Sequence, residues 1–234
     1  MLLGVIPARG GSKTIPRKNL HPLNGKPLID YTIEAAYASK LDDVVISSDD
    51  PAIIRRYKKV NKRPQALAGD STPMINVIIH TVRMYEDLMG LEVDAVMTLQ
   101  PTSPLRTAED IDTCIGLFEQ PVPSHIRLVD VPERHYDSLV SVIWGVHPIK
   151  SYRLEEGNEL EPFVPQEEPY DKHKHKCLTR NGAIFITRRD LLDSGRLIGD
   201  SPLFYVMPKS RSIDIDDYED LLIAEALLQK GELQ

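Results

Sequence analysis

The sequence predicts a single three-layer α/β domain, in which helices cover a mixed, mostly parallel sheet. The first 120 residues alternate short apolar runs with segments of helical periodicity, a pattern typical of parallel sheets. Beyond that point, strand-like runs are separated by polar stretches that contain proline. With 234 residues, of which 41% are hydrophobic, the chain can bury one substantial core, and we expect residues 1–234 to form one domain.

Short apolar runs mark the expected strands, which are residues 3–6, 44–47, 95–99, 139–144, 151–154, 183–187 and 204–207. Helical spacing and start signals mark the expected helices, which are residues 27–39, 51–59, 73–89, 107–118 and 218–229. Thr107, followed three residues later by Asp110, resembles a capping box with a shorter acid.

Two segments do not fit either pattern. Residues 7–26 are rich in Gly, Pro and Lys, and we expect an unusually long loop there. Residues 155–176 carry many charges and few large apolar side chains. We therefore expect residues 145–178 to form an excursion from the core rather than a linker between domains.

Composition excludes several classes of protein. The net charge of -7 argues against a general nucleic-acid binder, which needs a broad basic face. Cys114 and Cys177 lack metal-ligand spacing and predict plain thiols. The apolar part of residues 1–8 is too short for a signal peptide or a membrane span, so we expect no membrane association and a cytoplasmic location.

Basic side chains concentrate at the N-terminus. Residues 1–29 contain no acid and five basic residues, which are Arg9, Lys13, Arg17, Lys18 and Lys26. Four of these residues surround the pair Gly10-Gly11, where backbone N–H groups can approach phosphate oxygens closely. The alternative, a solvated basic turn, gives no reason for four cations around two glycines. The stretch therefore predicts a phosphate site.

The spacing in this stretch differs from two familiar phosphate loops. Neither Gly-x-x-x-x-Gly-Lys-Ser/Thr nor Gly-x-Gly-x-x-Gly is present. This argues against a kinase, a GTPase and a dinucleotide-dependent oxidoreductase.

Asp214 and Asp216 alternate along an extended stretch, which directs both carboxylates to the side opposite Ile213 and Ile215. Mg²⁺ prefers oxygen ligands and often combines one or two carboxylates with phosphates and water. The alternative is an acidic N-cap for the last helix. Both interpretations remain open at this point.

Two further stretches also allow structural interpretations. The segment from Gln100 to Pro104 follows an expected strand, where ligands bind in open α/β sheets, but its prolines equally suit a rigid turn. The run from Lys172 to Lys176 holds two histidines between lysines. A solvated charge run explains it better than a metal site, because lysines repel a cation.

The motifs together resemble those of the acylneuraminate cytidylyltransferases, the enzymes that make CMP-sialic acid and related CMP-nonulosonic acids. The matching stretches are residues 6–19, 99–106, 137–142, 147–150, 180–186 and 212–216. They occur in the order found in this family and span nearly the whole chain.

The resemblance implies a Rossmann-like nucleotidyltransferase fold and a homodimer in which the excursion packs on the second subunit. It also implies transfer of CMP from CTP to the anomeric hydroxyl of an acidic nonulosonic sugar, with release of pyrophosphate and with Mg²⁺ as cofactor. The implied metal ligands are Asp214 and Asp216, and the groups implied in catalysis are Arg9, Lys18 and Asp214. The implied nucleotide contacts are Arg9, Gly10, Gly11, Ser12, Lys13, Lys18, Asn19 and Arg63. The implied sugar contacts are Gln100, Lys150, Asn181 and Phe185.

One departure leaves the acceptor open. Where the sialic-acid enzymes carry an Arg-Gln pair, this chain has residues 169–173, Pro-Tyr-Asp-Lys-His. Lys172 can replace the charge of the arginine but not its bidentate fork. The remaining alternatives are another acidic acceptor, such as Kdo or a phosphonate, and a non-catalytic CTP-binding subunit.

Overall fold

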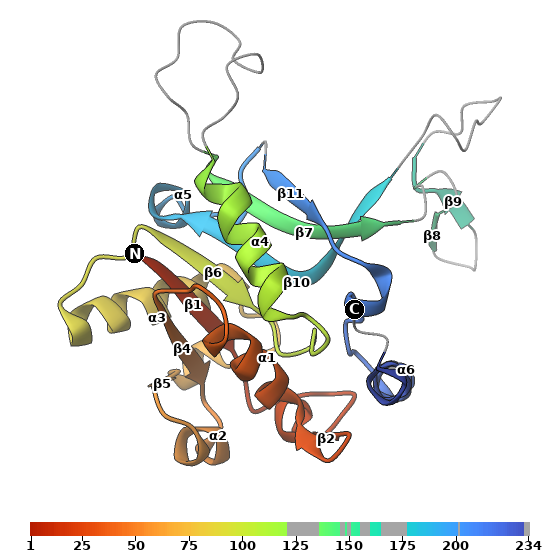
Figure 1. The fold of residues 1–234 in the computed structure, drawn as a ribbon, viewed down its shortest axis with the longest axis horizontal. Coiled ribbons are helices and arrows are strands. Elements are labelled where there is room, and N and C mark those ends of the chain that lie inside the picture. The colour runs from red at the N-terminus through yellow and green to blue at the C-terminus, as the bar shows by residue number, and fades with distance from the viewer. Residues whose placement is uncertain are drawn as a thin grey trace, which may run out of the picture.

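The computed structural model describes residues 1–120, 136–145, 148, 151–154, 160–164, 177–200 and 202–231. Its centre is a seven-stranded sheet in the order β11-β7-β10-β6-β1-β4-β5 (Figure 1). The strands are β1 (Leu2–Pro7), β4 (Asp43–Ser48), β5 (Val60–Lys62), β6 (Ala95–Leu99), β7 (Ser138–Trp144), β10 (Leu178–Arg188) and β11 (Leu203–Val206). Only β10 runs antiparallel to its neighbours β6 and β7, and the other pairs are parallel. The expectation of a mixed, mostly parallel sheet is confirmed.

Helices cover both faces of this sheet, which gives the three expected layers. Two helices, α1 (Leu28–Tyr37) and α4 (Ala108–Glu119), lie on one face. On the other face lie α3 (Met74–Met89) and the short α5 (Arg189–Asp193) (Figure 1).

Alternate strand residues point to the two faces and build two cores. The core under α1 and α4 includes Ile6, Ile29, Ile46, Met97, Leu99, Ile111 and Ile184. The core under α3 includes Leu3, Val5, Val45, Ile78, Val82, Val96 and Leu192.

A third, smaller core lies beside α6 (Tyr218–Lys230) and brings distant segments together. Ile15 from the long N-terminal loop is fully buried there against a cluster that includes Ile215 and Leu105. Burying a branched side chain of this size is worth about 1.5–3 kcal/mol. This contact fixes the basic loop beside the segment that carries Asp214 and Asp216.

Helix start signals mostly agree with the structure. Thr107 and Asp110 form the expected capping box at α4. At α6 the N-cap is Asp217, whose carboxylate accepts from the backbone of Glu219 and Asp220. The capping role therefore belongs to Asp217, which removes the structural alternative for the two aspartates before it.

The expected helix over residues 51–59 is too long. Helix α2 (Pro51–Arg56) ends early, and Lys59 adopts a left-handed conformation with φ of 53°. The carbonyl of Lys59 then accepts a hydrogen bond from the amide of Ile46 in β4. This bond comes directly before β5, which pairs with β4 at the sheet edge. Short elements that the sequence pattern also missed are α5, β9 (Leu160–Pro162) and the hairpin of β2 (Pro22–Leu23) and β3 (Lys26–Pro27).

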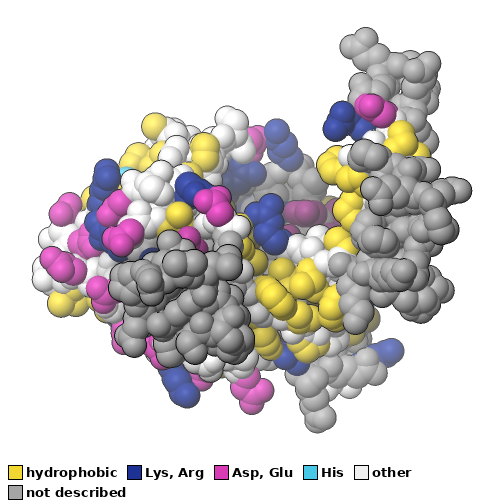
Figure 2. Space-filling model, turned by 90° about the horizontal axis from the view of Figure 1, so that it is seen from above, with side chains coloured by type: hydrophobic (Ala, Val, Ile, Leu, Met, Phe, Trp, Pro, Cys, Tyr) yellow, Lys and Arg dark blue, Asp and Glu magenta, His cyan; other side chains and the backbone are white. Residues whose placement is uncertain are grey.

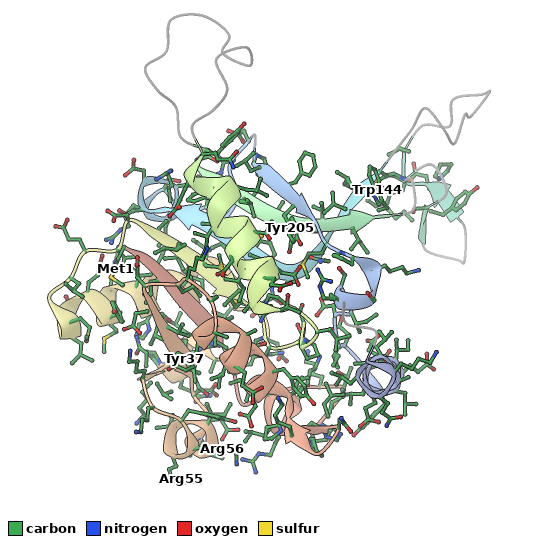
Figure 3. The ribbon with its side chains drawn as sticks, viewed as in Figure 1. Met1, Tyr37, Arg55, Arg56, Trp144 and Tyr205 are labelled. Carbon is green, nitrogen blue, oxygen red and sulfur yellow. The ribbon has the colours of Figure 1, made fainter. Side chains whose placement is uncertain are left out.

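The described part of the excursion is a separate hairpin of β8 (Tyr152–Leu154) and β9, which stands away from the main sheet (Figure 1). Figure 2 shows hydrophobic side chains grouped on the molecular face beside it. Trp144 lies where β7 reaches this region (Figure 3) and is 60% exposed, and Phe163 is 56% exposed. Lys150 and Lys172 lie outside the described residues. Among the described helices, none has the length and apolar content to cross a membrane.

Candidate active site

A cavity of about 440 Å³ opens at the carboxyl ends of β1 and β6, the usual ligand position in an open α/β sheet. Three segments meet there: the basic loop, the turn after β6 and the stretch before α6. Its lining includes Arg9, Gly11, Ser12, Lys13, Lys18, Asn19, Arg63, Asp70, Met74, Gln100, Thr102, Asp214 and Asp216. Tertiary structure thus brings together most of the predicted nucleotide and metal residues.

Arg9 and Lys13 converge on one carboxylate. Both form ion pairs with Asp70, and the Lys13 Nζ to Asp70 Oδ2 distance is 2.9 Å. Hydrogen bonds from Lys13 and then Arg9 lower the pKa of Asp70. Asp70 lies in a loop before α3 with no motif around it, so its sequence context did not predict a site residue. Its negative charge lies where an anionic ligand would meet the two cations.

Lys18 lies beside the aspartate stretch. Its Nζ donates to the carbonyl of Ile215 at 2.8 Å and lies 3.4 Å from Asp216 Oδ1. The Lys18 side chain is 13% exposed, whereas that of Asp216 is 82% exposed. A largely desolvated ammonium therefore faces the cavity next to two carboxylates.

Gly10 and Gly11 have different surroundings. The amide of Gly10 donates to Asp49 Oδ1 at 2.9 Å, so it is engaged within the protein. A β-carbon on Gly10 would lie 3.1 Å from that of Asp50, so a side chain there would press against Asp50. Gly11 lines the cavity and has open space around it. Asn19 holds the loop closed by donating to the carbonyl of Arg9 at 2.8 Å.

Arg63 is a buried cation in the cavity wall, only 5% exposed. Its guanidinium donates to the carbonyl of Ser47 at 2.9 Å. Burial lowers the pKa of Arg63; the nearby Asp49 opposes this shift and Arg9 adds to it. The contact with Ser47 fixes the direction of the guanidinium at the end of β4.

Asp214 is the more enclosed of the two aspartates. Burial raises the pKa of its carboxyl, and Asp216 adds to the rise while Thr102 and Lys18 oppose it. Oδ1 of Asp214 is buried and accepts no hydrogen bond from the described residues. A buried carboxylate oxygen without a donor is suited to a cation, because it has lost its hydration without replacement.

A second cavity of about 400 Å³ adjoins the first and shares Met74 and Gln100 with it. Its other lining residues are Thr98, Arg180, Phe185, Arg196, Leu197 and Ile198. Two of the predicted sugar contacts, Gln100 and Phe185, are therefore in one place. Arg180 and Arg196 were not predicted.

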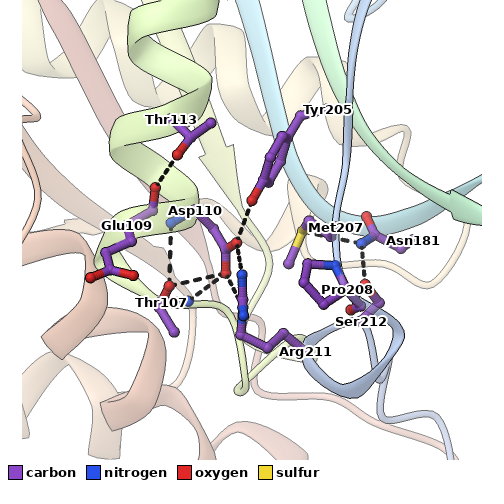
Figure 4. Close-up of polar contacts among 10 residues, drawn as sticks. All are labelled: Thr107, Glu109, Asp110, Thr113, Asn181, Tyr205, Met207, Pro208, Arg211 and Ser212. Carbon is purple, nitrogen blue, oxygen red and sulfur yellow. Dashed lines mark hydrogen bonds and ion pairs between the residues drawn. The ribbon is translucent and has the colours of Figure 1, made fainter. Parts of the chain in front are cut away.

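Asn181 lies outside the lining of both cavities. Its side-chain carbonyl accepts from Ser141 at 2.6 Å. Its amide nitrogen donates to Ser212 at 2.9 Å and to the sulfur of Met207 (Figure 4). These contacts attach β10 to the segment that leads to Asp214. Its role as a sugar contact stays a prediction, and Lys150, the fourth predicted contact, lies outside the described residues.

The model of the cytidylyltransferase family matches residues 3–192, which span β1 to α5 and include most of the residues that line the second cavity. The chain belongs to the cytidylyltransferase family. The family resemblance expected from the sequence motifs is thus confirmed.

Three curated relatives of this cytidylyltransferase carry the names of enzymes that form CMP-activated nonulosonic acids. N-acylneuraminate cytidylyltransferase of Escherichia coli is 32% identical over 240 residues, and the match covers all of this chain but 53% of that protein. The chain thus spans about half the length of that relative. CMP-N,N'-diacetyllegionaminic acid synthase of Legionella pneumophila is 29% identical, with 97% of this chain and 96% of that protein covered. Pseudaminic acid cytidylyltransferase of Campylobacter jejuni is 30% identical, with 96% and 95% covered.

Solved structures show that the fold is shared with more distant enzymes. A CMP:2-keto-3-deoxy-manno-octonic acid synthetase complexed with CTP matches with a TM-score of 0.66 at 18% identity, covering 98% of this chain and 99% of the other. A 4-diphosphocytidyl-2C-methyl-D-erythritol synthase from Anaerococcus prevotii matches with a TM-score of 0.57 at 12% identity, covering 97% and 96%. The expected nucleotidyltransferase fold is confirmed.

Proposed function

We propose that this cytidylyltransferase transfers CMP from CTP to the anomeric hydroxyl of a nonulosonic acid. In this reaction the hydroxyl oxygen forms a bond to the α-phosphorus. The bond from that phosphorus to the β-phosphate oxygen breaks, pyrophosphate leaves and the hydroxyl proton is released. One observation carries the proposal: a basic, glycine-containing cavity adjoins a second cavity of about 400 Å³, with which it shares Met74 and Gln100.

The basic cavity suits a triphosphate. Arg9, Lys13 and Lys18 provide three cations around Gly11, which leaves room for a phosphate oxygen near the backbone. Charge that develops on the phosphate oxygens in the transition state is stabilised by such preorganised cations. Arg63, held by Ser47, is the fixed cation next to the base or ribose.

We further propose that Asp214 and Asp216 hold Mg²⁺. The orphaned buried oxygen of Asp214 and the exposed carboxylate of Asp216 line the same cavity and suit this cation. Bound there, Mg²⁺ would neutralise phosphate charge. Within the described ranges, no group of three or more possible ligands is clustered, so phosphate oxygens and water would supply the remaining ligands. Ile215, buried between the two aspartates, keeps both carboxylates directed to the cavity.

Pyrophosphate release with each nucleoside triphosphate tests the reaction. The acceptors are N-acetylneuraminic, legionaminic and pseudaminic acids and Kdo, each measured with and without Mg²⁺. We expect release with CTP and one nonulosonic acid only. Binding of CTP without release for any acceptor would favour a non-catalytic subunit, and absence of CTP binding would overturn the proposal.

A direct measurement tests the metal site separately from activity. Mn²⁺ binding, followed by electron paramagnetic resonance in the presence of CTP, is expected to weaken at least tenfold in Asp214→Asn. Asp190→Asn provides the matched control, because Asp190 belongs to α5 and lines neither cavity. Unchanged Mn²⁺ binding in Asp214→Asn would contradict the assignment.

We also propose a homodimer in the cytoplasm. The exposed apolar side chains Trp144 and Phe163 beside the β8–β9 hairpin support a subunit interface, because such groups favour burial. The need for CTP, a cytosolic nucleotide, supports the location. Light scattering at increasing dilution tests the dimer, and a monomer at every concentration would exclude it.

A further inference from the structure

Strand β10 carries an irregularity that places two side chains in one cavity. It pairs with β7 on both sides of the irregularity, with Arg180 opposite Val142 and Phe185 opposite Val140. Val140 and Val142 share a face because side chains alternate along a strand. Arg180 and Phe185 therefore also share a face, although regular alternation would separate positions 180 and 185. Both line the second cavity.

The same irregularity reaches the predicted metal site. Gly182 adopts φ of +75°, and a β-carbon there would lie 3.0 Å from Asp214 Oδ2 and 3.9 Å from Gln100 Oε1. Arg106 holds this arrangement by donating to the carbonyls of Ala183 and Gln100. Arg180, two residues from Gly182, thus belongs to the end of the cavity that adjoins the aspartates.

The opposite end of the second cavity carries apolar side chains. Phe185 pairs with Thr98 of β6, deeper in the sheet, and Thr187 donates to the carbonyl of Leu197. Leu197 and Ile198 line this end together with Arg196. The guanidinium of Arg196 is already paired through two nitrogens with Asp200, at 2.5 and 3.3 Å. Arg180 is exposed, and among the described residues no carboxylate forms an ion pair with it.

We propose that Arg180 binds the carboxylate of the acceptor and that Phe185, Leu197 and Ile198 receive an apolar substituent at its far end. This inference rests on the proposed function, in which the acceptor carboxylate is attached to the same carbon as the attacking hydroxyl. The carboxylate must therefore lie at the end of the cavity nearest the nucleotide, where Arg180 is. A guanidinium can hold it through two parallel hydrogen bonds. Arg180 is a specificity-determining residue that selects α-keto acid sugars over neutral ones.

Paired substrates and variants test this assignment. The acid and the methyl ester of the best acceptor are compared in the wild type, in Arg180→Gln and in Arg180→Lys. In the wild type, we expect esterification to raise the acceptor KM roughly ten- to a hundredfold, the value of a charge-assisted contact. In Arg180→Gln, the KM values of acid and ester should become similar, while the KM for CTP stays unchanged. Arg180→Lys should restore part of the difference.

Two further variants make the result specific. Arg83→Gln, an exposed arginine on α3 that lines neither cavity, should behave as the wild type. Arg196→Gln should keep the preference for the acid. If Arg196→Gln abolishes that preference instead, the acceptor binds in the reverse direction and the proposal is wrong.

The failure of this inference is distinguishable from failure of the proposed function. A wild type that transfers CMP to an acid, with an unchanged acid-to-ester ratio in Arg180→Gln, overturns the role of Arg180 alone. A wild type that releases no pyrophosphate with any acid overturns the proposed reaction, and the role of Arg180 with it.

Discussion

Arg211 donates two hydrogen bonds to the buried carboxylate of Asp110, from Nε to Oδ2 at 2.9 Å and from a terminal nitrogen to Oδ1 at 2.8 Å (Figure 4). The hydroxyl of Tyr205 adds a third bond at 2.8 Å. Asp110 belongs to α4, whereas Arg211 lies three residues before Asp214. This ion pair therefore attaches the proposed metal segment to the body of the protein.

Removing the Asp110 carboxylate should weaken both the fold and the site. We expect Asp110→Ala to lower the free energy of unfolding by about 3–5 kcal/mol, because the Arg211 guanidinium, whose side chain is only 12% exposed, loses its partner. Glu109→Gln, an exposed neighbour in the same helix turn, should cost less than about 1 kcal/mol. Urea unfolding measures both, and equal stability of the two variants would contradict the role of the pair.

The same carboxyl predicts a pH dependence. Burial opposes ionisation of Asp110, but hydrogen bonds from Arg211, Thr107 and Tyr205 outweigh burial and lower its pKa. A carboxyl whose pKa is lower in the folded state stabilises the fold above its unfolded pKa of about 3.9. That contribution is lost as pH falls through the lower, folded pKa. The stability difference between the wild type and Asp110→Asn should therefore be constant above about pH 5 and shrink below about pH 4.

The contribution of Asp214 to stability should change with pH in the opposite direction. Its raised pKa means that the folded state disfavours the charged carboxylate, so folding is penalised as pH rises through the interval between the unfolded and folded pKa values. At pH 7 we expect Asp214→Asn to keep or increase the melting temperature while abolishing Mg²⁺-dependent turnover. Calorimetry and pyrophosphate release measure the two effects. Near-normal turnover would remove the metal role.

Gly182 tests the close approach of β10 to Asp214. Alanine there would be strained by the positive φ and would press against the carboxylate, so we expect a loss of about 1–2 kcal/mol in stability and a reduced kcat. Gly116→Ala in α4 is the matched control, because nothing lies within 4 Å of its added carbon. That control should be neutral or stabilising, by up to about 1 kcal/mol. Unfolding and steady-state kinetics distinguish the two glycines.

Asp70 should compete with CTP for Arg9 and Lys13. Neutralising it in Asp70→Asn removes the competing anion, and we expect the dissociation constant of CTP to fall by roughly two- to fivefold at low salt. The difference should disappear at high ionic strength, because salt screens exposed charges. Glu34→Gln, which breaks an exposed ion pair with Lys26 outside the cavity, is the control. Weaker CTP binding in Asp70→Asn would show that Asp70 instead helps to organise the site.

Much of the fold could be predicted from local patterns. All five predicted helices are present with ends shifted by a few residues, and the buried strands agree, because their signals lie within each segment. The predictions of secondary structure fail where contacts between distant residues determine whether a segment forms a strand. Residues 60–62 become a strand only because Ile46 and its neighbours offer a parallel edge. The start of β10 includes the exposed Thr179 and Arg180 and is interrupted at Gly182, so its pattern did not predict a strand of that length.

The candidate site likewise has features that local motifs predicted and features that depend on the fold. The basic glycine loop and the alternating aspartates could be recognised in the sequence, because each motif consists of residues that are neighbours along the chain. Three other relationships appear only in the folded chain: Asp70 pairs with Arg9, Gly182 lies against Asp214, and Arg180 and Phe185 line one cavity. These relationships depend on sheet order and on one strand irregularity. Both arise from packing between residues far apart in the chain, which no local spacing encodes.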